Sequence, residues 1–164
     1  MSKEKKSAPR TLDTTDRAIL NKLQRNAKLT HKEIAAALDL TVTPIYERIK
    51  RLERSGYIKG YHARISKEHL AFRVQAFANV SLQEHQTELL RRFEREVIKL
   101  PEVVACYHVA GQFDYLLHIM VPDMAAYQGF VTNRLAGLSD IRQVQSSFVM
   151  TEVKEYQGIP IAVR

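Results

Sequence analysis

The spacing of apolar residues changes near residue 73, and this change most constrains the fold. Before it, apolar residues recur three or four positions apart, as in amphipathic helices. After it, the segment RVQAFANVSL places Val74, Ala76, Ala78, Val80 and Leu82 at alternate positions, which is the pattern of a half-buried strand. A chain of 164 residues has room for two small domains. We therefore expect a helical domain followed by a domain built around a sheet.

Strand and helix patterns alternate in a definite order beyond residue 73. Strand patterns cover residues 73–82, 102–110, 113–121 and 142–154, and helix patterns cover residues 86–100 and 123–137. The order β-α-β-β-α-β predicts a ferredoxin-like fold, an antiparallel sheet with two helices on one face. Gly111 and Gln112 separate the two middle strands, which predicts a two-residue type II′ hairpin.

One predicted strand is apolar on both of its faces. In FDYLLHIMV, Tyr115, Leu117 and Ile119 lie on one face, and Leu116 and Met120 lie on the other. Two helices cover only one face of the sheet, so the second face needs a cover. A second copy of the chain is the simplest cover, and we therefore expect a two-fold dimer.

Three helix patterns precede the sheet. The first lies in residues 11–28, and the second, THKEIAAALDL, opens with Thr30 and Glu33 in the spacing of a capping box. Asp39 and Leu40 alone separate it from the third helix, so we predict a helix-turn-helix. Gly56 is expected at the left-handed C-cap of the third helix. Beyond it, residues 57–65 suggest a short strand or wing.

The third helix has one apolar and one polar face. Ile45, Ile49 and Leu52 share the apolar face, which should pack on the first two helices. A recognition helix presents its N-terminal residues to base edges in the major groove, and basic residues contact phosphates. Pro44 is tolerated in the first turn because that turn has no internal acceptors, whether Thr41 or Thr43 is the N-cap. The predicted DNA-binding residues are Thr41, Thr43, Tyr46, Glu47, Arg48, Lys50, Arg51 and Arg54.

The positive charge of the chain is confined to its first two-fifths. Residues 1–64 contain 15 Lys/Arg and 7 Asp/Glu, whereas residues 65–164 contain 10 and 11. Such asymmetry indicates a module that binds a polyanion, here double-stranded DNA, joined to a neutral domain. A solvated basic surface without a partner is the alternative.

Targeting and redox features point to the cytoplasm. The chain has a single cysteine, Cys106, which cannot form an internal disulfide. No apolar run approaches the roughly 18 residues that would cross a bilayer, and the N-terminal residues lack the apolar core of a signal peptide. We therefore expect no membrane association.

Four segments together resemble the Lrp/AsnC regulators, also called leucine-responsive or feast/famine proteins. They are LDTTDRAIL, TVTPIYERIKRLERSGYIKGY, AGQFDYLLHIMVPDMAAY and SSFVMTEVK, in this order and spacing. The resemblance implies an N-terminal (winged) helix-turn-helix followed by a ferredoxin-like βαββαβ effector domain. It also implies dimers that assemble further, often to octamers, and control by an amino acid held between effector domains.

These considerations divide the chain into five parts. We expect a disordered basic leader over residues 1–10, the helix-turn-helix domain over 11–60, and a linker strand or hinge over 61–72. The ligand-binding and oligomerisation domain should cover 73–156, with a C-terminal tail over 157–164.

An amino-acid effector needs partners for its carboxylate and its ammonium group. The turn at Gly111 and Gln112 offers amides for the carboxylate, and Asp114 can accept from the ammonium. The family's Gly-x-x-Asp-Tyr element matches Gly111, Asp114 and Tyr115, and the last strand of a neighbouring chain could add Ser146, Ser147 and Phe148. Alternatively, Gly111 only satisfies the turn, and Asp114 pairs with a backbone amide at the strand edge.

The sequence also bears on metal binding, on catalysis and on DNA binding without an effector. His108 and His118 lack a third ligand, so no metal is expected, and neither a catalytic residue nor a cofactor is predicted beside the amino-acid effector. The main alternative function is an architectural, chromatin-like DNA-binding protein without an effector response. An enzyme resembling the sirohaem decarboxylases would need His and Arg pairs around a cofactor, and only the two histidines are near.

Overall fold

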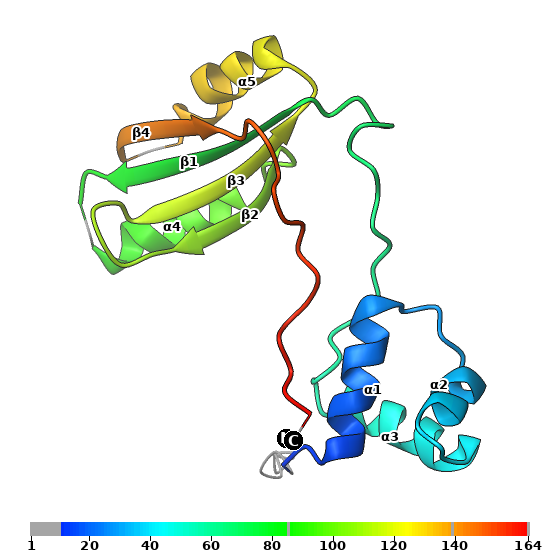
Figure 1. Ribbon diagram of the computed structural model, residues 1–164. Coiled ribbons are helices and arrows are strands. Elements are labelled where there is room, and N and C mark those ends of the chain that lie inside the picture. Colours follow the sequence, from blue (N-terminus) through cyan, green and yellow to red (C-terminus); the bar gives the residue numbers. More distant parts are fainter. Residues whose placement is uncertain (1–10, 85, 139, 164) are drawn as a thin grey trace. The chain divides into compact units, whose positions relative to one another are not determined.

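A computed structural model describes residues 11–84, 86–138 and 140–163 (Figure 1). The predicted leader over residues 1–10 lies outside this range. The chain forms two compact units. One contains residues 11–64 together with residues 154–163, and the other contains the described residues between 65 and 153. Within the described ranges, no helix is long and apolar enough to cross a membrane.

The first unit is built on three helices, as predicted. They are α1 (Thr14–Arg25), α2 (His31–Ala37) and α3 (Val42–Arg54). The capping box at the start of α2 is present, because the Thr30 side chain accepts from the Glu33 amide and Glu33 reaches back to Thr30. Ile19, Ile34 and Ile45, one from each helix, are completely buried together. Apolar packing thus fixes the three helices as one rigid body.

The start of α3 resolves which threonine precedes the helix. Thr41 occupies the N-cap position with extended backbone angles, and Val42 is the first helical residue. Pro44 is therefore the third helical residue, where its missing N–H leaves no hydrogen bond unmade. The Thr41 side chain makes no capping hydrogen bond. Gly56 follows the helix with a φ of +77°, as expected for the left-handed C-cap.

The segment after α3 differs from the prediction of a short strand. Residues 57–73 contain neither helix nor strand. A strand needs a hydrogen-bonded neighbour, and no described segment pairs with this one. Tyr61 instead donates from its hydroxyl to Glu53 Oε1 at 2.8 Å, which ties the exit of the unit to α3.

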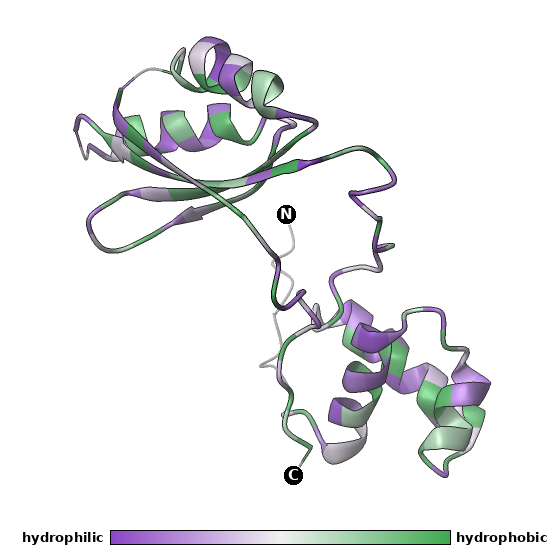
Figure 2. Cartoon of the chain, turned by 45° about the horizontal axis from the view of Figure 1, so that its top comes forward, coloured by the Kyte–Doolittle hydropathy of each residue, from purple (hydrophilic) through white to green (hydrophobic). Residues whose placement is uncertain are grey.

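The second unit has the predicted βαββαβ order. Its strands are β1 (Val74–Leu82), β2 (Val103–His108), β3 (Tyr115–Val121) and β4 (Ile141–Phe148), and its helices are α4 (Thr87–Val97) and α5 (Met124–Phe130). All pairings are antiparallel, in the sheet order β2-β3-β1-β4. Both helices cover the same face of the sheet, and their apolar residues alternate with hydrophilic ones (Figure 2).

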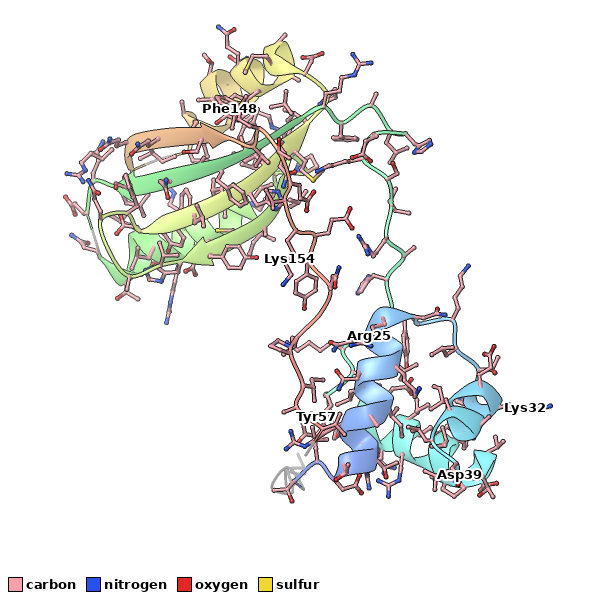
Figure 3. The ribbon with its side chains drawn as sticks, in the orientation of Figure 1. Arg25, Lys32, Asp39, Tyr57, Phe148 and Lys154 are labelled. Atoms are coloured by element: carbon pink, nitrogen blue, oxygen red, sulfur yellow. The ribbon has the colours of Figure 1, made fainter. Side chains whose placement is uncertain are left out.

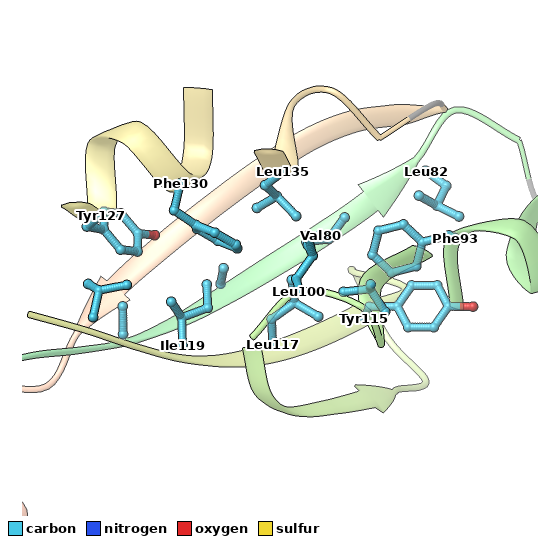
Figure 4. Packing of buried hydrophobic residues seen from close by; sticks show 14 residues of the cluster. Val80, Leu82, Phe93, Leu100, Tyr115, Leu117, Ile119, Tyr127, Phe130 and Leu135 are labelled. Carbon is cyan, nitrogen blue, oxygen red and sulfur yellow. The ribbon is translucent and has the colours of Figure 1, made fainter. Parts of the chain in front are cut away.

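The core of the second unit lies between this face and the helices (Figure 4). The alternating residues predicted from sequence form its floor, with Ala76, Ala78 and Val80 completely buried on β1. Phe93 from α4 and Phe130 from α5 pack onto them. The predicted ferredoxin-like fold is confirmed in the order of its elements, in its antiparallel sheet and in the sheet face that the helices bury.

Three details of the second unit differ from the sequence prediction. The β2–β3 connection runs from residue 109 to 114 and closes with the Val109 amide donating to the Asp114 carbonyl at 2.9 Å, so the two-residue hairpin was wrong. After α5 the helix continues as a π-helical turn, Val131–Leu135, which buries Leu135. The last strand ends at Phe148 rather than near residue 154, because its partner β1 begins at Val74.

Candidate DNA-binding and effector sites

The polar face of α3 carries the residues predicted to bind DNA. Thr41, Thr43, Glu47, Lys50 and Arg54 are exposed, whereas Tyr46, Arg48 and Arg51 are half-buried. Small hydroxyl side chains therefore occupy the helix start, and basic side chains occupy its later turns. The exposed N-terminal end of α3 is the end that a recognition helix presents to base edges.

Arg48 and Arg51 also hold α3 against α1. The Asp16 side chain is 4% exposed, and its carboxylate accepts from Arg51 Nη2 at 2.5 Å and from Arg48 Nη1 at 2.7 Å. Arg48 Nη1 also contacts Asp13 Oδ2 at 2.5 Å. The Asp16 amide, followed by the Arg48 guanidinium, lowers the pKa of Asp13, and Asp13 and Asp16 raise the pKa of Arg48. The guanidinium groups of Arg48 and Arg51 thus bind acidic side chains of α1 and its N-cap, while remaining partly exposed on the surface of α3.

Tyr46 is oriented by contacts on both sides. Its ring meets the His31 ring edge-to-face at 5.3 Å, and Lys50 Nζ lies 4.5 Å from its centre. The cation–π contact keeps Lys50 close to the surface of α3 while leaving its charge exposed.

The predicted effector residues of the β2–β3 turn divide into exposed and structural ones. Gly111 and Gln112 are exposed, and a Cβ on Gly111 would meet nothing within 4 Å. Asp114 Oδ2 accepts from the Leu82 amide at 2.8 Å, so Asp114 does pair with a backbone amide of a neighbouring strand. Tyr115 is 1% exposed, packs on Phe93 and donates to Glu94 Oε1 at 3.0 Å. Asp114 and Tyr115 therefore build the frame that presents the turn.

The predicted effector residues of β4 lie on opposite faces of the sheet. Ser146 and Phe148 face the helices, where Ser146 Oγ lies 2.5 Å from the Tyr127 hydroxyl and Phe148 meets the Tyr127 ring edge-to-face at 4.9 Å. Ser147 pairs with Phe77 of β1 and faces the other side. Phe148 remains 41% exposed. It lies at the end of β4, where it is labelled in Figure 3. Ser146, Phe148 and Tyr127 thus form one partly open cluster.

The turn and the β4 cluster are not brought together within one chain. Along β1, Val80 pairs with Tyr115 next to the turn, whereas Ala76 pairs with Phe148. Four residues of strand separate these levels, a distance of roughly 13 Å, and β3 and β4 lie on opposite sides of β1. Phe148 and the turn are therefore well separated within one chain, whereas Ser146, opposite Ala78, lies two residues nearer to the turn.

The sheet face opposite the helices, here called the open face, carries Phe77, Leu116, Met120, Tyr107 and His118. Tyr107 is 55% exposed. His118 stacks on Phe77 with ring centres 4.8 Å apart, and its Nε2 lies 2.8 Å from Gln75 Nε2. Because Lys67 donates to Gln75 Oε1 at 2.8 Å, the amide group of Gln75 is directed at an unprotonated imidazole nitrogen. Burial lowers the pKa of His118, and Lys67 adds to this effect while Glu152 opposes it.

His108 and His118 do not form a pair that could hold a metal ion. His118 lies on the open face, whereas His108 stacks on Tyr115 at 4.8 Å on the helical side. In the parts of the chain that the structure describes, no three His, Cys, Asp or Glu residues are placed to hold a metal ion. Burial raises the pKa of the Cys106 thiol to about 11.

Sequence reasoning missed Asp16 and Tyr127, which contact residues of the two predicted sites. Asp16 is three residues after the N-cap Asp13, so its sequence context indicated only a helix start. Tyr127 lies on α5, and its contact with β4 depends on tertiary packing that no local spacing shows.

Comparison with known proteins supports this two-part organisation. A model described as "Winged helix-turn-helix DNA-binding" matches residues 12–59, and one described as "Lrp/AsnC ligand binding domain" matches residues 75–159. The leucine-responsive regulatory protein of Escherichia coli is 35% identical over 164 residues, covering all of both chains. The Bkd operon transcriptional regulator of Pseudomonas aeruginosa is 36% identical over 150 residues, covering 92% of this chain and 98% of its own.

Solved structures agree with these sequence relatives. A transcriptional regulator from Neisseria meningitidis in complex with L-Met superposes with a TM-score of 0.87 at 37% identity, covering 92% of this chain and 97% of its own. An AsnC family regulator from Agrobacterium tumefaciens superposes with a TM-score of 0.86 at 35% identity, covering 91% and 97%. The chain belongs to the Lrp/AsnC family of transcriptional regulators.

Proposed function

We propose that this chain acts in the cytoplasm as a sequence-specific DNA-binding regulator whose affinity for its operator changes when an amino acid binds. The observation that carries the DNA-binding part is the exposed start of α3, where Thr41 and Thr43 precede the basic residues Lys50 and Arg54 on one rigid three-helix unit. We assign base contacts to Thr41, Thr43, Tyr46 and Glu47, and phosphate contacts to Arg48, Lys50, Arg51 and Arg54.

The effector is proposed to be an apolar amino acid. Relatives include a regulator solved with L-Met and leucine-responsive proteins, which supports this class of ligand. Gly111 and Gln112 are proposed to bind the carboxylate, while Ser146, Ser147 and Phe148 of a neighbouring chain contribute hydroxyl groups and an apolar wall. Asp114 and Tyr115 are proposed to hold the turn in position and to form part of the effector site.

Operator binding is expected to depend on salt and on the exposed cations of α3. Replacing Lys50 or Arg54 with alanine should weaken binding by about 1 kcal/mol each, because each loses a phosphate contact. Fluorescence anisotropy with operator DNA at several salt concentrations measures both effects. The exposed Arg91 of α4, outside the DNA-binding unit, serves as the matched control when replaced with alanine. Binding that is indifferent to salt and to both substitutions would contradict the proposal.

The same anisotropy titration tests the effector. The titration is repeated in the presence of each of the twenty amino acids. At least one apolar amino acid, L-Met or L-leucine among the candidates, should change the affinity of the protein for operator DNA. Unchanged affinity with all twenty, and no heat of binding in calorimetry, would favour the architectural DNA-binding alternative.

Self-association is proposed to occur through the open face and to depend on pH. A second copy would cover Phe77, Leu116, Met120 and Tyr107, and dimers would assemble into larger particles. Burial lowers the pKa of His118 below its ordinary value, so we expect association to weaken only at acidic pH, where this imidazole becomes protonated. Sedimentation velocity measures this, and His118→Gln should reduce the pH dependence. A lone 18.9 kDa species at pH 7 would refute the dimer.

A further inference from the structure

The C-terminal segment docks on α1 of the DNA-binding unit. Residues 154–163 contain neither helix nor strand and belong to the same compact unit as the three helices. Asn21 Nδ2 donates to the Ile161 carbonyl at 2.9 Å, and Arg17 Nη1 donates to the Ala162 carbonyl at 3.4 Å. These bonds join residues that are 140 and 145 positions apart in the chain. We call residues 154–163 the tail.

The docking surface is one stripe of α1. Arg17, Asn21 and Gln24 are spaced four and three residues apart, which places them on a common helix face. That face is turned away from the buried side of α1, where Ile19 and Leu23 pack into the core. The stripe is therefore free of the packing that holds the three helices together.

Gln24 recognises the backbone of the tail. Its Nε2 donates to the Ile159 carbonyl at 2.9 Å, and its Oε1 accepts from the Ile159 amide at 3.0 Å. A single side-chain amide thus satisfies both polar groups of residue 159, as a neighbouring strand would. Because the partners are backbone atoms, the stripe is suited to an extended peptide.

Gly158 makes this close approach possible. Its φ is +104°, and a Cβ at this position would lie 2.5 Å from Gln24 Oε1 and 2.7 Å from Gln24 Cδ. A side chain would therefore meet both backbone strain and steric overlap. An ion pair between Arg64 and Glu155 fastens the beginning of the tail to the residue where the chain leaves the unit.

We propose that the Arg17–Asn21–Gln24 stripe is a docking surface for the chain's own tail, and that the docked tail is a second tether through which β4 influences the DNA-binding unit. The chain leaves this unit after residue 64 and returns at residue 154. Only residues 149–153 separate the end of β4 from the tail, a span of at most roughly 17 Å. The influence of an amino acid through Ser146 and Phe148 rests on the function proposed above.

Disulfide trapping in the full-length chain tests the docking. In a Cys106→Ser background, Asn21→Cys combined with Ile161→Cys should oxidise to an intrachain disulfide, seen as a faster-migrating monomer on a non-reducing gel. Adding Gly158→Val should lower the yield about tenfold, because a β-branched residue opposes this backbone conformation. The exposed Val163→Ala change, which leaves the backbone bonds intact, is the matched control. Absence of the disulfide, or a disulfide-linked dimer instead, would overturn docking of the chain's own tail.

The tether is tested in chains without engineered cysteines. In the Gln24→Ala and Gly158→Val variants, saturating L-Met should leave the operator Kd almost unchanged. The affinity for L-Met measured by calorimetry, and the operator Kd measured without L-Met, should both equal the wild-type values. An unreduced effect in both variants would overturn the tether. If L-Met and the other amino acids leave the wild-type operator Kd unchanged, the effector part of the proposed function and the tether fail together, whereas the disulfide result still decides the docking.

Discussion

Replacing Asp16 with alanine is expected to destabilise the DNA-binding unit by about 2 kcal/mol. The Asp16 carboxylate is buried and accepts from Arg48 and Arg51. Removing one partner of a fully buried ion pair costs about 3–5 kcal/mol, whereas an exposed pair contributes about 1 kcal/mol or less. An intermediate value follows because the Arg51 side chain, at 36% exposed, can recover hydration.

Urea unfolding followed by circular dichroism measures this loss, and anisotropy should show operator Kd rising by about tenfold or more as α3 loses its fixed orientation. Asp13→Asn is the matched control in the same network. Asparagine is an equally good N-cap, and the Asp13 side chain is 50% exposed, so this change should cost less than about 1 kcal/mol. Equal losses in the two variants would show that the buried carboxylate has no special role.

Replacing Asp114 with alanine is expected to destabilise the second unit by about 2 kcal/mol in the absence of any amino acid. Asp114 Oδ2 is the acceptor for the amide of Leu82, a residue that is 1% exposed. A buried amide left without its acceptor costs about 1–3 kcal/mol. This prediction separates a structural Asp114 from one that serves only to bind an effector ammonium group.

The comparison variant is Asp114→Asn, whose side-chain oxygen can still accept from the Leu82 amide. Asp114→Asn should therefore be nearly as stable as the wild type, although it lacks the negative charge. Chemical unfolding of the ligand-free variants provides both values. Wild-type stability in Asp114→Ala, combined with lost amino-acid binding, would instead assign the carboxylate to the ligand alone.

Local signals in the sequence predicted the elements well. The Thr30–Glu33 capping box and the left-handed Gly56 are both present. Asp123, predicted as the start of α5, accepts from the Ala126 amide at 2.8 Å. Each of these features depends on residues within a few positions of one another, where hydrogen bonding and backbone preference act directly.

Features that depend on distant partners were not predictable in this way. The two-residue hairpin was wrong because the ladder between β2 and β3 ends at His108 and Tyr115, a limit set by sheet pairing rather than by Gly111. The pairing of Arg51 with Asp16 joins residues 35 positions apart, and the periodicity of α3 revealed only that Arg51 is polar. Chain-wide packing, which local spacing does not contain, decides such contacts.

The return of the tail to α1 has a consequence for the order of synthesis. The helices of the first unit are synthesised before the second unit, but the partners of Asn21 and Gln24 emerge only after it. The second unit, which lies between them in the chain, can therefore be complete before the first unit receives its final contacts. The DNA-binding unit is begun before the second unit and completed after it, so a nascent chain stalled before residue 158 would carry its helices without the segment that docks on α1.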